Sequence, residues 1–136
     1  MEHRKPPLPA YFSNPTPGIC RWCNKPMTKV LKNGKLSKST WHDKCVKEYK
    51  LLHWPSYTRK AVWKRDKGNC SQCSTVCDKR GPNGWHMDHI VPLYSVQGQL
   101  WAWGLGNLQT LCKPCHKIKT SSEATARALV RKTKSK

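Results

Sequence analysis

Four pairs of potential metal ligands constrain this 136-residue chain more than any other feature, because two residues separate the members of every pair. In chain order, the pairs are Cys20 with Cys23, His42 with Cys45, Cys70 with Cys73, and Cys112 with Cys115. Such a gap lets both side chains of a pair face one tetrahedral ion from a tight turn. The first two pairs and the last two pairs each make a closed set of four ligands, which predicts two structural zinc sites.

Two zinc sites would compensate for a small hydrophobic core. Hydrophobic residues make up 37% of the chain, whereas an ordinary globular chain has roughly 45–50%. A structural zinc ion can contribute about 10 kcal/mol or more to folding. We therefore expect a small α+β fold that is stapled by zinc. Cys77 belongs to none of the four pairs, and it is either a free thiol or a substitute for a neighbouring ligand.

The sequence contains no recognisable membrane-spanning segment and no recognisable secretory signal. No segment has the roughly 20 consecutive apolar residues that cross a bilayer, and no apolar run follows the charged residues at the N-terminus. We expect an intracellular protein, cytoplasmic or nuclear, that is neither secreted nor bound to a membrane. In such a reducing compartment, cysteines bind metal rather than form disulfides.

Basic residues outnumber acidic ones by 26 to 7, which gives the chain a formal charge of +19. A surface of this charge favours a polyanionic partner, and nucleic acid is the most common one. Charge alone also allows an anionic membrane surface or a ribosomal role. Charge therefore indicates a class of partner but does not indicate which reaction, if any, the protein catalyses.

Proline, charge and ligand pairs divide the chain into four parts. Half of the ten prolines lie in residues 1–18, which predicts an extended basic arm. Residues 19–55 hold the first ligand set and are interpreted as a small zinc finger. Residues 56–122 hold the second set and form the main domain, and residues 123–136 form a basic tail.

Turn-forming residues predict where the regular elements begin and end. The expected elements are a helix over residues 45–52 stopped by Pro55, a helix from Ser56 or Thr58 to Gly68, strands over 85–91 and 108–111, and a helix opened by Pro114. The last three elements follow the order strand, loop, strand, helix. They are therefore expected to form a ββα unit that the second zinc site clamps.

Five polar residues of this unit suggest a second kind of metal site. Asp88 and His116 offer one oxygen and one imidazole nitrogen, and two protein ligands leave the other positions of a divalent ion open for substrate. His89 is neutral near physiological pH, which suits removal of a proton from water. The carbonyl groups of Asn107 can fix the tautomer of that imidazole. Lys119 lies on the helical face of His116, where it can meet a phosphate.

These five residues lie in two segments, WHMDHIVP at 85–92 and GNLQTLCKPCHKIKT at 106–120. Both segments resemble the HNH (His-Asn-His) endonucleases of the ββα-metal, or His-Me finger, superfamily. The upstream pair Cys70 and Cys73 matches the zinc-bound, four-cysteine variety of that motif. The resemblance covers about residues 58–120, and the N-terminal finger more loosely resembles the treble-clef modules that precede some HNH domains.

The resemblance implies a role for each residue of the motif. It implies that His89 is the general base and that Asn107 orients it. It further implies that Asp88 and His116 hold one catalytic Mg²⁺ or Mn²⁺ ion. The fold that it implies is an HNH domain preceded by a small zinc finger module.

The leading hypothesis is a metal-dependent DNA endonuclease or nickase that hydrolyses phosphodiester bonds, with double-stranded DNA as its partner. Two copies would be needed to cut two half-sites, so the hypothesis allows a homodimer on DNA. Family analogy favours a phage or restriction setting. The alternative is a non-catalytic zinc-finger module that binds nucleic acid, with a basic RNA-associated zinc protein as a third hypothesis.

Three aromatic side chains near the motif have two interpretations each. His86 shares a strand face with Asp88, and it either lines the cleft or serves as an extra metal ligand. Trp101 and Trp103 lie in the segment that joins the two strands. They either pack under that segment or stack on DNA bases.

Overall fold

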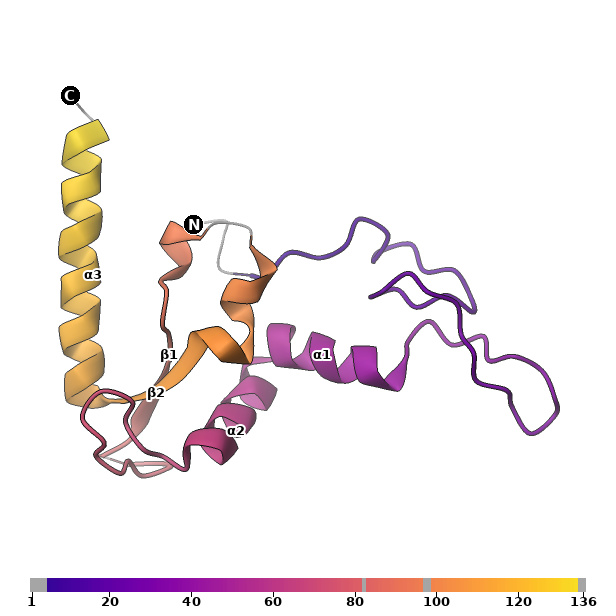
Figure 1. The fold of residues 1–136 in the computed structure, drawn as a ribbon, viewed down its shortest axis with the longest axis horizontal. Coiled ribbons are helices and arrows are strands. Elements are labelled where there is room, and N and C mark those ends of the chain that lie inside the picture. The colour runs from indigo at the N-terminus through magenta and orange to yellow at the C-terminus, as the bar shows by residue number, and fades with distance from the viewer. Residues whose placement is uncertain (1–4, 82, 97–98, 135–136) are drawn as a thin grey trace.

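The computed structural model of the protein describes residues 5–81, 83–96 and 99–134. In chain order its elements are helices α1 (Asp43–His53) and α2 (Pro55–Asp66), strand β1 (Trp85–His89), the 3₁₀ helices η1 (Leu93–Ser95), η2 (Leu100–Trp103) and η3 (Leu105–Asn107), strand β2 (Leu108–Cys112) and helix α3 (Lys113–Lys134). The expected small α+β fold and its ββα order are confirmed (Figure 1).

The first cysteine pair of each ligand set folds into the same tight turn. In the first turn, the amide of Cys20 donates to Lys25 O (2.9 Å) and Cys20 O accepts from Asn24 N (2.8 Å). In the second turn, the amide of Cys70 donates to Thr75 O and Cys70 O accepts from Ser74 N, at 2.9 Å each. Asn24 and Ser74 take positive φ angles of 60° and 63°. This shared geometry is why a gap of two residues recurs in the sequence.

An aromatic cluster holds the N-terminal finger together. Trp22 is buried beside Cys20, Met27 and Cys45. Its ring meets Tyr49 of α1 edge-on, with ring centroids 5.7 Å apart. The finger thus has a small core of its own next to its four metal-ligand side chains.

The described part of the N-terminal arm departs from the expected extended chain. Residues 9–14 form turns in which Phe12 N donates to Pro9 O and Asn14 N donates to Tyr11 O. The physical reason is aromatic packing, since the Phe12 ring stacks on Tyr49 at 5.4 Å between centroids. Residues 1–4 of the predicted arm lie outside the described residues.

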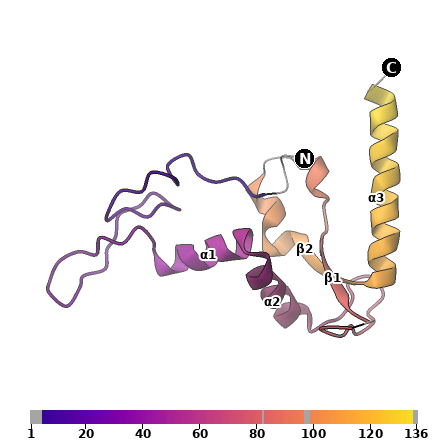
Figure 2. The ribbon, with the colours of Figure 1, turned by 180° about the vertical axis from the view of Figure 1, so that it is seen from behind.

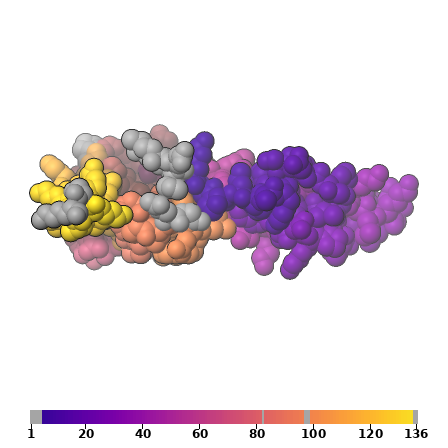
Figure 3. All heavy atoms as spheres, turned by 90° about the horizontal axis from the view of Figure 1, so that it is seen from above, coloured from indigo at the N-terminus to yellow at the C-terminus, as the bar shows by residue number. Residues whose placement is uncertain are grey.

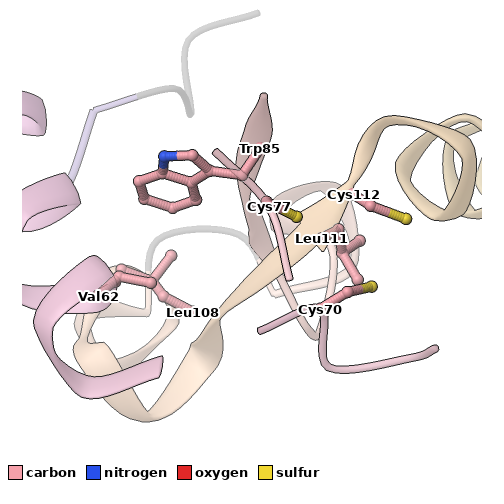
Figure 4. Packing of buried hydrophobic residues seen from close by; sticks show 7 residues of the cluster. All are labelled: Val62, Cys70, Cys77, Trp85, Leu108, Leu111 and Cys112. Carbon is pink, nitrogen blue, oxygen red and sulfur yellow. The ribbon is translucent and has the colours of Figure 1, made fainter. Parts of the chain in front are cut away.

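The two strands form an antiparallel pair whose register runs from Trp85 opposite Cys112 to His89 opposite Leu108. Because side chains alternate along a strand, Trp85 and Met87 face α2, where Val62 packs against them. Figure 4 shows Val62 and Leu108 next to one another below the Trp85 ring, with three cysteines close to Leu111. Asp88 points to the other face, toward α3.

A salt-bridged pair at the end of α2 fixes β2. Arg65 donates to Leu105 O (2.7 Å) and Leu108 O (2.6 Å), and it also pairs with Asp66 (2.7 Å). Asp66 in turn accepts a hydrogen bond from the buried hydroxyl of Thr110 (2.9 Å). The hydrogen bond from Arg65 holds the pKa of Asp66 below its ordinary value. These bonds anchor the strand that leads into α3.

The start of α2 and the end of β1 differ from the sequence-based expectation. Pro55 ends α1, as expected, but it also opens α2 as its first residue, with Trp54 in the N-cap position. Proline fits there because the first helical amide needs no partner within the helix. Strand β1 ends at His89 rather than at residue 91, because the next two residues bond to Asn107.

The molecule is elongated, with the finger at one end and α3 at the other (Figures 1 and 2). Seen from above, the atoms of the N-terminal module gather at the end opposite the tip of α3 (Figure 3). Helix α3 runs without a break through residue 122 to Lys134, so the expected tail is helical over its described residues. Within the described residues, no helix is both long and apolar enough to cross a bilayer.

Candidate active site and zinc centres

The carboxylate of Asp88 is held in one orientation at the sheet face that meets α3. Its Oδ2 accepts hydrogen bonds from Gln109 Nε2 (3.1 Å) on β2 and from Lys119 Nζ (2.9 Å) on α3. Its Oδ1 faces His116 Nε2 at 3.9 Å. The two bonds to Oδ2 therefore leave Oδ1 and the imidazole nitrogen as a pair of ligand atoms side by side.

This pair of atoms fits a shared divalent ion. Ligand atoms about 2.1 Å from one ion lie about 3.0 Å apart at right angles and about 4.2 Å apart on opposite sides. The distance of 3.9 Å between Asp88 Oδ1 and His116 Nε2 falls within that interval. The side chain of His116 is 31% exposed, which leaves room for a substrate and for water.

Lys119 contacts protein groups rather than an open phosphate position. Its ammonium donates to Asp88 Oδ2, to His89 O (2.9 Å) and to the carboxylate of Glu123. Burial alone would lower the pKa of Lys119, but the bonds to Glu123 and Asp88 outweigh it and raise the pKa. Glu123 was missed by the sequence analysis, although its position seven residues after His116 puts both on one face of α3.

His86 stacks on His116, with ring centroids 4.1 Å apart and ring planes 10° from parallel. Burial lowers the pKa of His86, and electrostatic interactions with His116, Lys113 and Arg59 lower it further. His86 therefore lines the cleft as a neutral ring. Its use as an extra ligand stays a prediction.

His89 lies at the end of β1, next to Asp88 in sequence, and it is half-buried. In the described part of the chain, neither of its ring nitrogens has a hydrogen-bond partner. Burial lowers the pKa of His89; the charge of Asp88 opposes this effect and the charge of Lys119 adds to it. The imidazole is thus neutral near pH 7 and within electrostatic reach of the Asp88 cluster.

Asn107 contacts the backbone that follows His89, and not the imidazole itself. Its side chain accepts from Val91 N (2.8 Å) and donates to Val91 O (3.1 Å) and Ala102 O (2.9 Å). Its own carbonyl accepts from Ile90 N (2.8 Å). Asn107 therefore holds the chain segment that follows β1. Among the described residues it makes no hydrogen bond to the ring of His89, although such a bond was expected.

Replacing Asn107 with alanine should lower the free energy of unfolding by about 2–4 kcal/mol, because each buried group left unpaired costs about 1–3 kcal/mol. Denaturant unfolding measures this loss. Gln99→Ala is the matched control, since within the described residues the exposed side-chain amide of Gln99 bonds only to the exposed Trp101. It should cost less than about 0.5 kcal/mol. An equal loss of unfolding free energy in the two variants would contradict this structural role of Asn107.

Both predicted ligand sets come together with the spacing of a tetrahedral metal site. In each set the ligand atoms all lie within 4.8 Å of one another, and the sets are Cys20, Cys23, His42 and Cys45, and Cys70, Cys73, Cys112 and Cys115. Zinc–sulfur bonds of about 2.3 Å place two tetrahedral sulfurs about 3.8 Å apart. Cys73 Sγ and Cys112 Sγ lie 3.7 Å apart. Both sets could therefore hold zinc.

The histidine of the first set uses Nδ1 toward the site. His42 Nδ1 lies 3.4 Å from Cys23 Sγ and 3.9 Å from Cys45 Sγ. Its Nε2 lies 3.3 Å from Pro26 O. A hydrogen bond from the second ring nitrogen to a carbonyl orients a metal-binding imidazole, as is usual for such ligands.

The thiols of each set differ strongly in pKa. Burial would raise the pKa of Cys70, but hydrogen bonds from the backbone at Cys112, Cys73 and Gln72 bring it to about 6. Cys20 also has a pKa of about 6, whereas Cys115 is raised to about 12 by its bonds to neighbouring thiols. A bound cation would favour the thiolate form of all four side chains of the second set.

Cys77 is buried in the core of the ββα unit and lies outside the second ligand set. Its thiol points toward Thr75 O at 3.9 Å. The geometry fits the interpretation of Cys77 as a free thiol.

The two tryptophans of the connecting segment behave differently. Trp103 is 7% exposed and packs inside, whereas Trp101 is 51% exposed and donates to Gln99. Packing therefore accounts for Trp103. A role of Trp101 in stacking on DNA bases stays a prediction.

Comparison with known proteins places this site in a family. The HNH endonuclease family model matches residues 70–122, which hold the second ligand set and the Asp88 cluster. A probable HNH endonuclease of Lactococcus phage SK1 is 37% identical over 75 residues, which cover 54% of this chain and 74% of the phage protein. The chain belongs to the HNH endonuclease family. The enzyme class expected from the HNH motif is thereby confirmed at the level of the family.

More distant relatives align over most of the HNH chain. The DNA annealing helicase and endonuclease ZRANB3 of Mus musculus and that of Homo sapiens are each 26% identical over 156 aligned residues, covering 84% of this chain. The chain spans only 14% of the length of either relative. No solved structure gives a significant match.

Proposed function

We propose that this HNH protein is a metal-dependent endonuclease or nickase that hydrolyses phosphodiester bonds in DNA. The observation that carries the proposal is the pair formed by Asp88 Oδ1 and His116 Nε2, which lie 3.9 Å apart, with a neutral His89 next to Asp88 in the chain. A zinc finger that only binds nucleic acid has no use for such an open pair. Family membership supports the nuclease activity, and the finer assignments of residues are our own.

In this proposal, each residue of the cluster has one task. His89 accepts the proton of the attacking water at a ring nitrogen that is free of hydrogen bonds within the described residues. A divalent ion such as Mg²⁺ or Mn²⁺, held by Asp88 and His116, would neutralise charge on the scissile phosphate. Lys119 fixes the Asp88 carboxylate and His89 O, and Asn107 holds the backbone after His89 in place.

DNA is the proposed substrate for two reasons. The formal charge of +19 suits a polyanion, and two relatives are named DNA annealing helicase and endonuclease. Double-stranded DNA and a homodimer on two half-sites belong to the same proposal. The division into a finger at 19–55 and a nuclease domain at 56–122 is likewise proposed.

A supercoiled plasmid tests the activity. The zinc-loaded chain with Mg²⁺ or Mn²⁺ should give relaxed or linear product, and Asp88→Asn should give none while it keeps both zinc ions. Asparagine has the shape of aspartate but lacks the charge that a hard cation needs. An intact plasmid with every metal, together with tight DNA binding, would favour the non-catalytic zinc-finger module instead.

Cleavage should fall as the pH drops below His89's pKa. Burial lowers this pKa from the ordinary value of about 6.5. The base works only when neutral, so kcat/KM should be flat near pH 7 and fall about tenfold per pH unit on the acid side of a midpoint below 6.5. A pH profile at saturating Mn²⁺ measures this midpoint. A rate that rises with acidity would contradict the role of His89 as a base.

A further inference from the structure

A strongly basic groove, separate from the Asp88 cluster, lies between α2 and the loop that follows the second cysteine turn. Its volume is about 900 Å³, and six cationic side chains line it: Arg59, Lys60, Lys64, Lys67, Lys79 and Arg80. Among the described residues that line it, none is acidic. Figure 1 shows α2 and this loop near one another, at the edge of the sheet away from the tip of α3. We refer to this feature as the basic groove.

The periodicity of α2 explains why the charges gather on one side. The helix buries Val62 against the ββα core, and its Thr58 is buried beside α1, where the hydroxyl donates to Leu51 O. Its lining residues recur three or four positions apart, at 56, 59, 60, 63, 64 and 67, and so share another helical face. The basic groove is therefore a continuous stripe along the helix rather than a chance cluster of surface lysines.

Two indole rings form the floor of the basic groove. The rings of Trp63 and Trp85 lie 5.5 Å apart. Arg59 Cζ lies 4.2 Å from the centroid of Trp85, and Lys79 Nζ lies 5.7 Å from the centroid of Trp63. Cation–π contacts of this kind are worth about 0.5–1 kcal/mol at exposed sites, and they hold the charges in fixed positions.

The covered Trp85 ring limits what kind of ligand fits. Trp85 is 8% exposed and Arg59 lies over its ring, so its face is not available to a nucleobase. Proteins that bind single strands need free aromatic faces on which bases can stack. The basic groove instead offers fixed positive charge, which suits the phosphates of a duplex whose bases remain paired.

The basic groove lies at the start of β1, and the candidate active site lies at the end of the same strand. Trp85 begins β1, and Asp88 and His89 end the same strand. A rise of about 3.3 Å per residue puts Trp85 about 13 Å from His89, which corresponds to about four base pairs of B-DNA.

We propose that the basic groove binds the sugar-phosphate backbone of the duplex DNA that flanks the cut, about four base pairs from the scissile phosphate. The inference rests on the proposed DNA endonuclease function and adds a contact outside the HNH cluster. Such contacts carry no sequence information, and they fix the position of the duplex relative to the active site. They also make affinity depend steeply on salt.

The test compares two variants that remove the same charge from different places. The groove variant carries Lys60→Ala, Lys64→Ala, Lys79→Ala and Arg80→Ala. The control carries Lys29→Ala, Lys32→Ala, Lys35→Ala and Lys38→Ala in the finger. All eight side chains are exposed, so both variants should fold. Each is made in the His89→Ala chain, and the affinity for a labelled duplex is measured at several salt concentrations without added divalent ion.

The groove variant should bind at least about tenfold more weakly, and the slope of log affinity against log salt should fall by about 3 to 4, or about 0.9 per phosphate contact. The control should change this slope by no more than about 1. Equal losses in both variants, or a loss confined to single-stranded DNA, would overturn the inference. Because binding is measured without cleavage, an inactive wild-type enzyme would refute the proposed function and leave this result standing.

Discussion

Replacement of His89 by alanine is expected to lower kcat/KM for DNA cleavage by about 10²–10⁴-fold, the usual contribution of a positioned general base. The reason lies in the environment of the imidazole. Burial keeps it neutral, and its ring nitrogens have no protein partner among the described residues, so it is free to accept a proton. Zinc content and affinity for uncleaved duplex should stay close to those of the wild type.

A second histidine provides the matched control for this prediction. His53 is also half-buried, its pKa is also lowered by burial, and it lines the same cavity as His89, of about 620 Å³. It lies on α1 of the finger and stacks on Tyr49. His53→Ala should keep most of the cleavage activity. Equal loss in the two variants would indicate that the cavity, rather than the imidazole of His89, supports the rate.

Replacement of Cys112 by alanine is expected to unfold the HNH domain. Its thiol is buried at the end of β2, beside Cys73, where it completes the second ligand set. A structural zinc ion contributes about 10 kcal/mol or more, whereas a whole domain is stable by only about 5–15 kcal/mol. Zinc analysis should fall from two ions per chain to about one, and the folded signal of the ββα unit should be lost.

Cys77→Ala separates the loss of a metal ligand from the loss of a buried thiol. Cys77 is 4% exposed and lies in the same core as Cys112, but it belongs to neither ligand set. Its replacement should cost about 1 kcal/mol, as is usual for a small change in a core, with both zinc ions retained. Two zinc ions in a folded Cys112→Ala protein would refute the structural role of that site.

The sequence predicts the parts of this fold that depend on local chemistry. Ligand spacing gives both cysteine turns, because a turn of this kind needs only its own backbone hydrogen bonds. The strands are found within two residues, since Pro92 and Pro114 interrupt regular pairing beside them. The helix after Pro114 is likewise expected, and it continues through the region that the sequence assigned to a tail.

Features that depend on contacts between distant segments could not be predicted from the sequence. The turns around Phe12 form because its ring finds Tyr49, 37 residues further along the chain. Asn107 was expected to hold the ring of His89, whereas it bonds to the backbone at Val91. Only part of the basic groove could be predicted from the sequence. The periodic basic residues of α2 can be recognised there, but the contribution of Lys79 depends on how the loop folds back toward the helix.

The most direct test of the account is diffraction at the manganese absorption edge, from crystals grown with Mn²⁺ and a duplex that cannot be cleaved. The account predicts one strong anomalous peak bonded to both Asp88 Oδ1 and His116 Nε2, next to a phosphate of the DNA. A duplex seated on the protein with no manganese between these two atoms would contradict it.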